Sequence, residues 1–224
     1  MKIKLFFFIF IFTSLCTLPS CAPMHFVKPL NKKQQAATVS LGGPLITYGN
    51  TVIPVPFLTA TYGYGIDSTL TGFTSLNVTS ALFGNFQMDI GATKQLLKQH
   101  RYCPAISITP VANIIYRNKD AYKFYPQLAV NAFWEYGKHK NFIYIGLDNW
   151  FELSQKRAFD VTQPNHWILM PSLGHNFTGK KWNFNIETKV IAPNLSNQNL
   201  VVDYQTPLKT HGAFGIYIGC ARKF

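Results

Sequence analysis

Residues 181–191 read KWNFNIETKVI, and the order of apolar and polar side chains in this stretch decides the fold. One face carries Trp182, Phe184, Ile186, Thr188 and Val190, and the other carries Asn183, Asn185, Glu187 and Lys189. Only a period of two separates these sets, because successive side chains of an extended strand point to opposite faces. The stretch therefore predicts a β-strand with one apolar and one polar face.

The same alternation returns along the rest of the chain. Residues 122–136 repeat it, with Phe124, Leu128 and Trp134 on one face and Lys123 and Gln127 on the other. Weaker copies mark eight further segments: 37–45, 56–64, 73–82, 85–92, 105–116, 141–152, 166–176 and 212–224. Turn-forming residues such as GIDS (65–68), YGKHK (136–140) and TGKK (178–181) separate many of them. The sequence predicts an all-β chain of about ten strands, within a range of about 8 to 12.

Composition indicates where such a sheet can be stable. Charged residues make up 13% of the chain and aromatic residues 15%, whereas about a quarter of a typical soluble domain is charged. No run of about 18 apolar residues follows Leu18, so no transmembrane helix is predicted. A closed barrel is the remaining way to pair every backbone group inside a bilayer. We therefore expect a single antiparallel up-and-down transmembrane β-barrel; a soluble β-sandwich is the alternative fold, since sandwich strands also alternate.

The N-terminus has the pattern of an export signal. Lys2 and Lys4 precede an apolar run from Leu5 to Leu18 that is too short to span a bilayer. The run ends in LPSC (18–21), which resembles the lipobox of bacterial lipoproteins. That resemblance implies cleavage before Cys21 and acylation of Cys21; ordinary signal cleavage nearby is the alternative. We expect a signal peptide at 1–20, a tether at 21–35 and the barrel at 36–224.

The C-terminus carries a second resemblance. Phe214, Ile216, Ile218 and Phe224 share one face of the last strand, and Phe224 ends the chain. This resembles the C-terminal signature of outer-membrane β-barrels of Gram-negative bacteria, an alternating strand with a final aromatic residue. The resemblance implies that the export and barrel-assembly machineries are partners and that the chain is located in the outer membrane. Arg222 departs from the signature, which prefers an apolar residue there.

The charge balance points to anionic partners in the envelope. The 21 basic and 9 acidic residues give a net charge of +12. An exported chain rarely meets nucleic acid, so we expect no nucleic-acid partner; lipid headgroups and lipopolysaccharide are the anions available to it. Aromatic residues near the predicted strand ends suit a membrane belt. They are Tyr62, Tyr64, Tyr116, Trp134, Tyr136, Trp150, Phe151, Trp167, Phe177 and Trp182.

The strand phase also predicts which polar residues face the interior. The candidates for a luminal network are Asp89, Asn131, Glu135, Asp148, Glu187 and Lys189. The spacing of the histidines and cysteines matches no metal motif, and no cofactor-binding or catalytic motif is recognised. His166, His175 and Ser172 are the only set that suggests a lipid-modifying site, and alternation sets His175 and Ser172 on opposite faces. Cys103 and Cys220 are expected to be unpaired, because they lie on distant strands.

Two features leave alternatives open. Residues 92–103, ATKQLLKQHRYC, interrupt the alternation and are predicted to form a short amphipathic helix, a plug or a loop. The function is open as well, and we expect a structural, surface-binding or adhesive role in the cell envelope. A periplasmic lipid-anchored ligand binder of sandwich or lipocalin-like fold is the alternative, followed by a lipid-modifying enzyme or a narrow pore.

Overall fold

The computed structural model describes residues 25–118, 121–156, 162–198 and 202–224. Its strands are β1 (Gln35–Tyr48), β2 (Thr51–Pro54), β3 (Phe57–Asp67), β4 (Leu70–Asn77), β5 (Phe86–Leu97), β6 (Ala105–Asn118), β7 (Ala121–Tyr136), β8 (Asn141–Phe151), β9 (Trp167–Thr178), β10 (Trp182–Ser196) and β11 (His211–Lys223). One helix, α2 (Val78–Leu82), follows β4. No helix in these ranges is long and apolar enough to cross a membrane.

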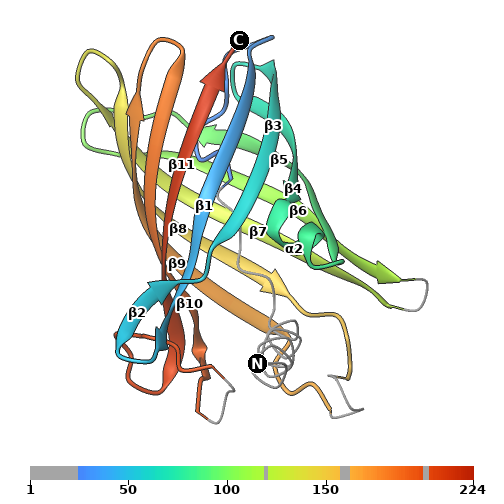
Figure 1. Ribbon diagram of the computed structural model, residues 1–224. Coiled ribbons are helices and arrows are strands. Elements are labelled where there is room, and N and C mark those ends of the chain that lie inside the picture. Colours follow the sequence, from blue (N-terminus) through green and yellow to red (C-terminus); the bar gives the residue numbers. More distant parts are fainter. Residues whose placement is uncertain (1–24, 119–120, 157–161, 199–201) are drawn as a thin grey trace, which may run out of the picture.

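Ten of these strands form a closed antiparallel barrel (Figure 1). Each pairs with its neighbour in chain order from β3 to β11, and β1 pairs with both β3 and β11. The closing seam is continuous, since nine consecutive residue pairs join β1 to β11, from Ala36↔Lys223 to Pro44↔Gly215. β2 lies outside the ring and forms a hairpin with the end of β1. The predicted ten-strand barrel is confirmed, and the sandwich alternative is wrong because there is a single closed sheet.

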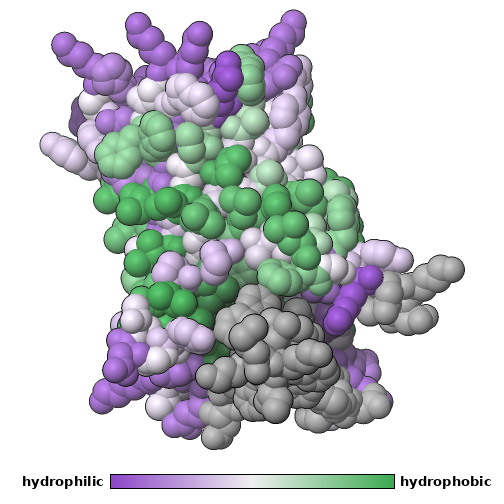
Figure 2. Space-filling view, viewed as in Figure 1, coloured by the Kyte–Doolittle hydropathy of each residue, from purple (hydrophilic) through white to green (hydrophobic). Residues whose placement is uncertain are grey.

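The barrel is apolar outside and polar inside. Leu128, Val130, Ile145 and Ile186 are among the exposed outward residues, and Figure 2 shows such residues as a green band between two hydrophilic ends. Inward positions hold buried hydroxyl, amide and charged side chains. A lipocalin-like binder would have the reverse arrangement, so the geometry defines a transmembrane β-barrel.

The two ends of the barrel differ. At the end that holds Phe224 and the start of β1, short turns join β3 to β4, β7 to β8 and β9 to β10; we call it the turn end. The opposite end, the loop end, carries the β2 hairpin, α2 and the long connections 152–166 and 197–210. Turns GIDS, YGKHK and TGKK thus lie opposite both long connections, as the strand count predicts.

Three local expectations are corrected. The predicted strand 73–82 corresponds to β4, which ends at Asn77. Residues 78–82 form α2 because the Asn77 side chain accepts a hydrogen bond from the Ser80 backbone and caps the helix. Residues 92–97 are strand, so the helix, plug and loop alternatives are all wrong there, whereas residues 98–103 form a connection, as the loop alternative predicts. β5 has a register shift between Gln95 and Leu97. Trp150 does not belong to the aromatic belt, since it points inward and is 0% exposed.

Candidate functional site: the barrel interior

The described chain begins inside the barrel. Residues 25–34, which we call the luminal segment, run along the inner wall toward the turn end before β1 starts. Backbone atoms make most of the contacts: Phe26 O accepts from Thr93 Oγ1 at 2.8 Å, Val27 O accepts from Ser107 Oγ at 2.6 Å. Nearer the turn end, the backbone N of Leu30 donates to Thr71 Oγ1 at 2.7 Å. Part of the expected tether is therefore docked in the lumen.

Small inward side chains make room for this segment. A Cβ at Gly63 would lie 2.5 Å from the Phe26 ring, and a Cβ at Gly65 would lie 2.0 Å from the backbone oxygen of Asn31. Neither approach is possible for a larger residue without displacement. The Phe26 ring packs against Phe73 with the centroids 5.9 Å apart. The wall of β3 and β4 is thus shaped to the segment.

Two side-chain contacts fix the ends of the first half of the luminal segment. His25 Nε2 lies 3.4 Å from Asp89 Oδ2, and Asp89 also accepts a hydrogen bond from the Asn113 amide. Lys28 forms an ion pair with Glu135. Asp89 and Asn113 are almost fully buried, so the histidine and amide contacts compensate for the removal of the carboxylate from water.

A second charged group fills the opposite wall. Lys189 Nζ donates to Asp148 Oδ2 at 2.9 Å and lies 3.2 Å from Glu187 Oε1. The hydroxyl of Tyr144 donates to Glu187 Oε2 at 2.7 Å. The lysine side chain is 2% exposed. These groups come from β8 and β10, two strands apart, so the network crosses the inner face of the intervening β9.

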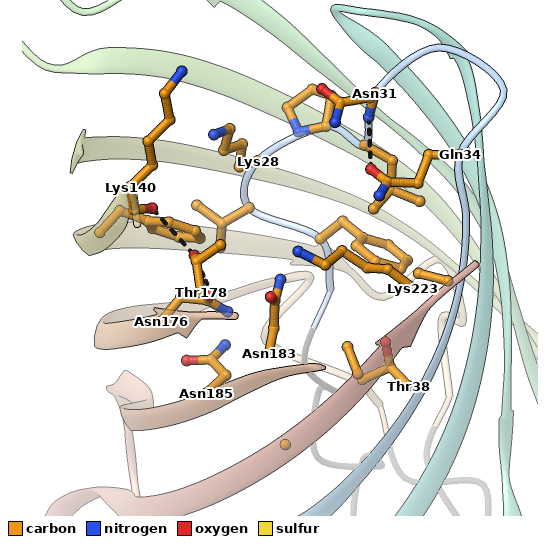
Figure 3. A pocket seen from close by; sticks show the side chains of 18 of the residues that line it. Lys28, Asn31, Gln34, Thr38, Lys140, Asn176, Thr178, Asn183, Asn185 and Lys223 are labelled. Carbon is orange, nitrogen blue, oxygen red and sulfur yellow. Dashed lines mark hydrogen bonds between the residues drawn. The ribbon is translucent and has the colours of Figure 1, made fainter. Parts of the chain in front are cut away.

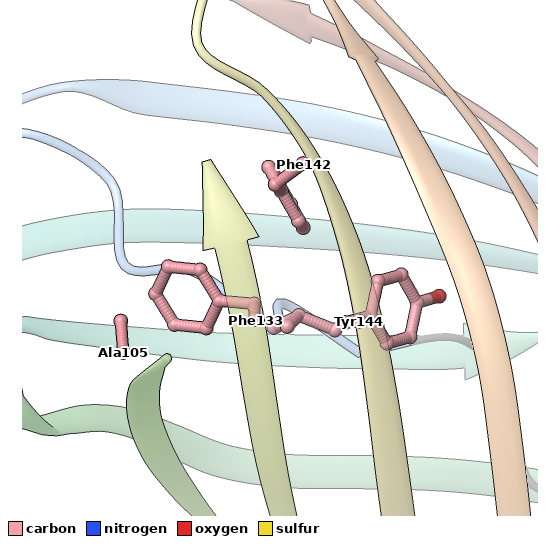
Figure 4. Close-up of a cluster of buried hydrophobic side chains, with 5 residues drawn as sticks. Ala105, Phe133, Phe142 and Tyr144 are labelled. Atoms are coloured by element: carbon pink, nitrogen blue, oxygen red, sulfur yellow. The ribbon is translucent and has the colours of Figure 1, made fainter. Parts of the chain in front are cut away.

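Apolar side chains form two buried clusters in the interior. Val27 of the luminal segment joins Ala105, Phe133, Phe142 and Tyr144 in one cluster (Figure 4). A second cluster consists of Tyr125, Trp150, Ile168 and Met170, against which Ile115, Ile191, Ala192 and Leu195 pack. Buried aromatic residues on inward positions leave little space along the axis, as in other small barrels whose interiors are filled by side chains.

All six luminal candidates lie on inward positions, and the structure brings only some of them together. Asp148, Glu187 and Lys189 form one group, Asp89 and Glu135 each contact the luminal segment, and Asn131 is buried beside Gly146. His25, Lys28 and Tyr144 were not predicted from the sequence. The phase of 141–152 places Tyr144 on the same face as Asp148 and could have found it, whereas nothing in the alternation marks His25 or Lys28.

A cavity of about 280 Å³ remains at the turn end, between the luminal segment and the wall formed by β8 to β11 and β1. We call it the turn-end cavity. Figure 3 shows Lys28 and Lys223 beside it, with amides and hydroxyls below them, whereas the Lys140 side chain extends upward from the rim, away from Lys223. Lys223 Nζ donates to Gly179 O at 2.7 Å. No aspartate or glutamate is among the residues that line the cavity.

The remaining candidates are dispersed. Ser172 is buried on the inner face, whereas His175 is on the outer face beside Tyr136, and the His166 ring bonds the Glu152 backbone oxygen at 2.7 Å. Cys103 and Cys220 are both free. Within the described residues, no three His, Cys, Asp or Glu side chains gather as metal ligands. Cys21 lies outside the described residues.

The residues of the C-terminal signature lie on one side of the last strand. Ile216 and Ile218 are exposed on the outer face of β11, and Phe224 follows the strand, exposed, with its backbone N bonded to Gln35 O at 2.9 Å. Phe214 has the same strand phase and is half-buried. The apolar set therefore lies on the face that would meet lipid.

Comparison with solved structures finds other barrels. The translocator domain of autotransporter NalP from Neisseria meningitidis has 8% identity and a TM-score of 0.46, with 85% of this chain and 88% of that one covered. An outer-membrane channel from Pseudomonas putida F1 has 11% identity and a TM-score of 0.48 over 91% and 100%. The NanC porin has 7% and 0.44 over 83% and 98%. At these values the likeness supports no functional assignment. No family model and no curated protein matches the sequence.

Proposed function

We propose that the chain is a sealed outer-membrane β-barrel that acts as a scaffold and exposes its loop end for surface binding. The observation that carries this proposal is the filled interior. The luminal segment, two apolar clusters and the Lys189 network occupy the described lumen, and a ten-stranded ring is narrow compared with the 16-stranded porins that leave an aqueous channel. A conducting role is therefore not favoured, and the barrel wall supports the loops.

The loop end presents an exposed hairpin, formed by β1 and β2, of which β2 is not part of the barrel ring. Tyr48 is 64% exposed and Val52 is 51% exposed on the hairpin of β1 and β2. This hairpin is braced from the side, because Gln205 N donates to Leu45 O at 2.9 Å and Thr47 N donates to Asp203 O at 2.9 Å. A rigid hairpin that presents apolar side chains is suited to contact with a partner.

Membrane insertion follows from the same geometry. We propose that the apolar band contacts outer-membrane lipid, that the turn end faces the periplasm because periplasmic turns are short, and that basic residues at the rims contact lipid headgroups and lipopolysaccharide. The C-terminal set Phe214, Ile216, Ile218 and Phe224 is proposed to be the signal read by the barrel-assembly machinery.

Chain length restricts a lipid anchor. Cys21 lies four residues before His25, so it can reach at most about 14 Å from it. His25 contacts Asp89, which is three residues from the loop-end start of β5 and eight from its turn-end finish. We therefore propose that a lipid on Cys21 can hold the chain at the turn end only when the luminal segment leaves the lumen. Extraction of Cys21→Ser should still require detergent, because the barrel alone holds the protein in the bilayer; release into buffer would contradict membrane insertion.

The sealed barrel is tested by conductance. Purified protein in planar bilayers should show no stable ion current, while its migration on a gel should shift on heating as that of a folded barrel does. A 16-stranded porin prepared in the same way is the positive control. Reproducible channel steps from protein that is folded by the gel criterion would overturn the sealed reading.

The surface role is tested separately. Cells that lack the protein should adhere to surfaces or aggregate less than wild-type cells, and the hairpin variant Val52→Ser/Ile53→Ser should behave like the deletion although the barrel reaches its normal level. A matched substitution at the turn end, Lys138→Ser, should change nothing. Equal adherence of wild-type, deletion and hairpin strains would refute the surface role and leave the barrel fold untouched.

A further inference from the structure

The turn-end cavity combines three cations with unused polar atoms, and the luminal segment forms one of its sides. Lys28, Lys140 and Lys223 line it together with His139. None of the described residues that line it is an aspartate or glutamate, and Glu135, which lies nearby, is already paired with Lys28. Lys28 and Lys223 are like charges that line the same cavity, so they repel each other. An anion between them would remove that repulsion and gain charge-assisted hydrogen bonds.

The deeper part of the cavity contains polar atoms that need hydrogen-bond partners. The Thr38 hydroxyl oxygen and the Asn183 amide oxygen are buried and have no hydrogen-bond partner among the described residues. Buried polar atoms are nearly always paired with protein or with another molecule. The amide oxygen requires a donor, and the hydroxyl can accept or donate. Both lie below the lysines (Figure 3), so a ligand that satisfies them carries hydroxyl groups beside its anionic end.

We propose that the turn-end cavity is a binding site for a small phosphorylated polyol. Its phosphate contacts Lys223 and the free positions of Lys28, Lys140 turns inward from the rim to meet it, and its hydroxyls reach Thr38 and Asn183. A volume of about 280 Å³ is at the lower limit of small-molecule sites, so the ligand is small. The same chemistry is found in soluble glycerol phosphate and in the headgroup of phosphatidylglycerol. This site does not depend on the surface role proposed above.

The probe is sn-glycerol 3-phosphate, titrated by calorimetry at low ionic strength into the folded protein in nanodiscs of zwitterionic lipid. Wild type should bind it, and Lys140→Met/Lys223→Met should bind at least about tenfold more weakly, because the variant loses two charge-assisted hydrogen bonds to the phosphate. The matched control is Lys98→Met/Lys138→Met, which removes the same charge at the same end from residues that do not line the cavity. The control should keep wild-type affinity, and all variants should show heat-modifiable migration.

Two further arms resolve the chemistry and the source. Thr38→Val should weaken glycerol phosphate about three- to tenfold and leave inorganic phosphate unchanged. The protein is also titrated in nanodiscs that contain phosphatidylglycerol. If the natural ligand is soluble, the protein should bind glycerol phosphate equally well in these and in zwitterionic nanodiscs. If the lipid headgroup occupies the cavity, phosphatidylglycerol should weaken binding of the soluble probe. The proposal is overturned when folded wild type does not bind glycerol phosphate, or when the control loses as much affinity as the cavity variant.

Discussion

Replacing Lys189 by methionine tests whether the buried charges hold the barrel together. The lysine is 2% exposed, and its two carboxylate partners, Asp148 and Glu187, are 11% and 6% exposed, with Nζ···O separations of 2.9 and 3.2 Å. Methionine keeps most of the volume but leaves two buried carboxylates without a cation. Breaking a buried pair by removing one partner costs about 3–5 kcal/mol. We expect a loss of this size in the free energy of unfolding.

The assay is urea unfolding of the barrel reconstituted in lipid vesicles, followed by tryptophan fluorescence at neutral pH. The control removes all three charges, as Lys189→Met/Asp148→Asn/Glu187→Gln, and should recover more than half of the lost stability, because no uncompensated charge is left. A single Lys189→Met variant that unfolds at the wild-type urea concentration would refute the reasoning. So would a triple variant that is as unstable as the single one, since the cost would then come from packing.

Three further outcomes are expected. Gly63→Leu should displace the Phe26 ring, which a Cβ would approach to 2.5 Å, and should make a cysteine introduced at Val27 reactive to a water-soluble maleimide; unchanged protection would contradict the docked segment. Ile145→Lys should destabilise the reconstituted barrel by about 2–4 kcal/mol, as a lysine on the lipid face near the midplane does, and equal urea midpoints would argue against lipid contact. Cys103, which is exposed, should react with a water-soluble maleimide in the folded protein, while Cys220 on the outer face of β11 should be shielded by lipid. A disulfide between them on a non-reducing gel would contradict the expectation that both thiols are free.

The alternation of side chains predicted most of the fold. Each face of the stretch 182–190 is where the period of two places it, since Phe184 and Ile186 are exposed and Glu187 and Lys189 are buried. The pattern is strong because the two sides of a transmembrane sheet meet different environments, hydrocarbon outside and a filled lumen inside. Trp150 could have been placed by the same phase, two residues after the inward Asp148, but its position near the strand end suggested the belt instead.

The failures have local causes. Residues 92–97 lost their alternation because a register shift between Gln95 and Leu97 adds one residue to β5 and brings two leucines together. Residues 78–82, VTSAL, do not alternate, because Val78, Ala81 and Leu82 have the three- and four-residue spacing of a helix face, and Asn77 caps them as a helix. That cap was a readable signal, because asparagine is one of the preferred N-cap residues.

The luminal segment was invisible for a different reason. Its main contacts run from its own backbone to wall hydroxyls such as Thr93 and Ser107, and backbone atoms leave no trace in the segment's sequence. The signal lies in the wall instead. Inward positions on β3 to β6 are mostly small, among them Thr59, Thr61, Gly63, Gly65, Thr71, Ser75, Gly91, Thr93, Ala105, Ser107 and Thr109, whereas β7 to β11 supply Tyr125, Phe133, Tyr144, Trp150 and Tyr217.

This asymmetry explains why the interior is filled as it is. A ring with bulky residues on one wall and small ones on the other leaves an off-centre gap along β3 to β6, and the hydroxyls on that wall need partners once water is excluded. The luminal segment meets both requirements, because it adds volume where the side chains are short and offers carbonyl and amide groups to the threonines and serines. The cavity at the turn end lies against β8 to β11, where the wall residues at that end, among them Thr178, Gly219 and Ala221, are short as well. Segment and cavity therefore both lie where inward side chains are short; the segment fills the gap along β3 to β6, and the gap beside β9 to β11 stays open.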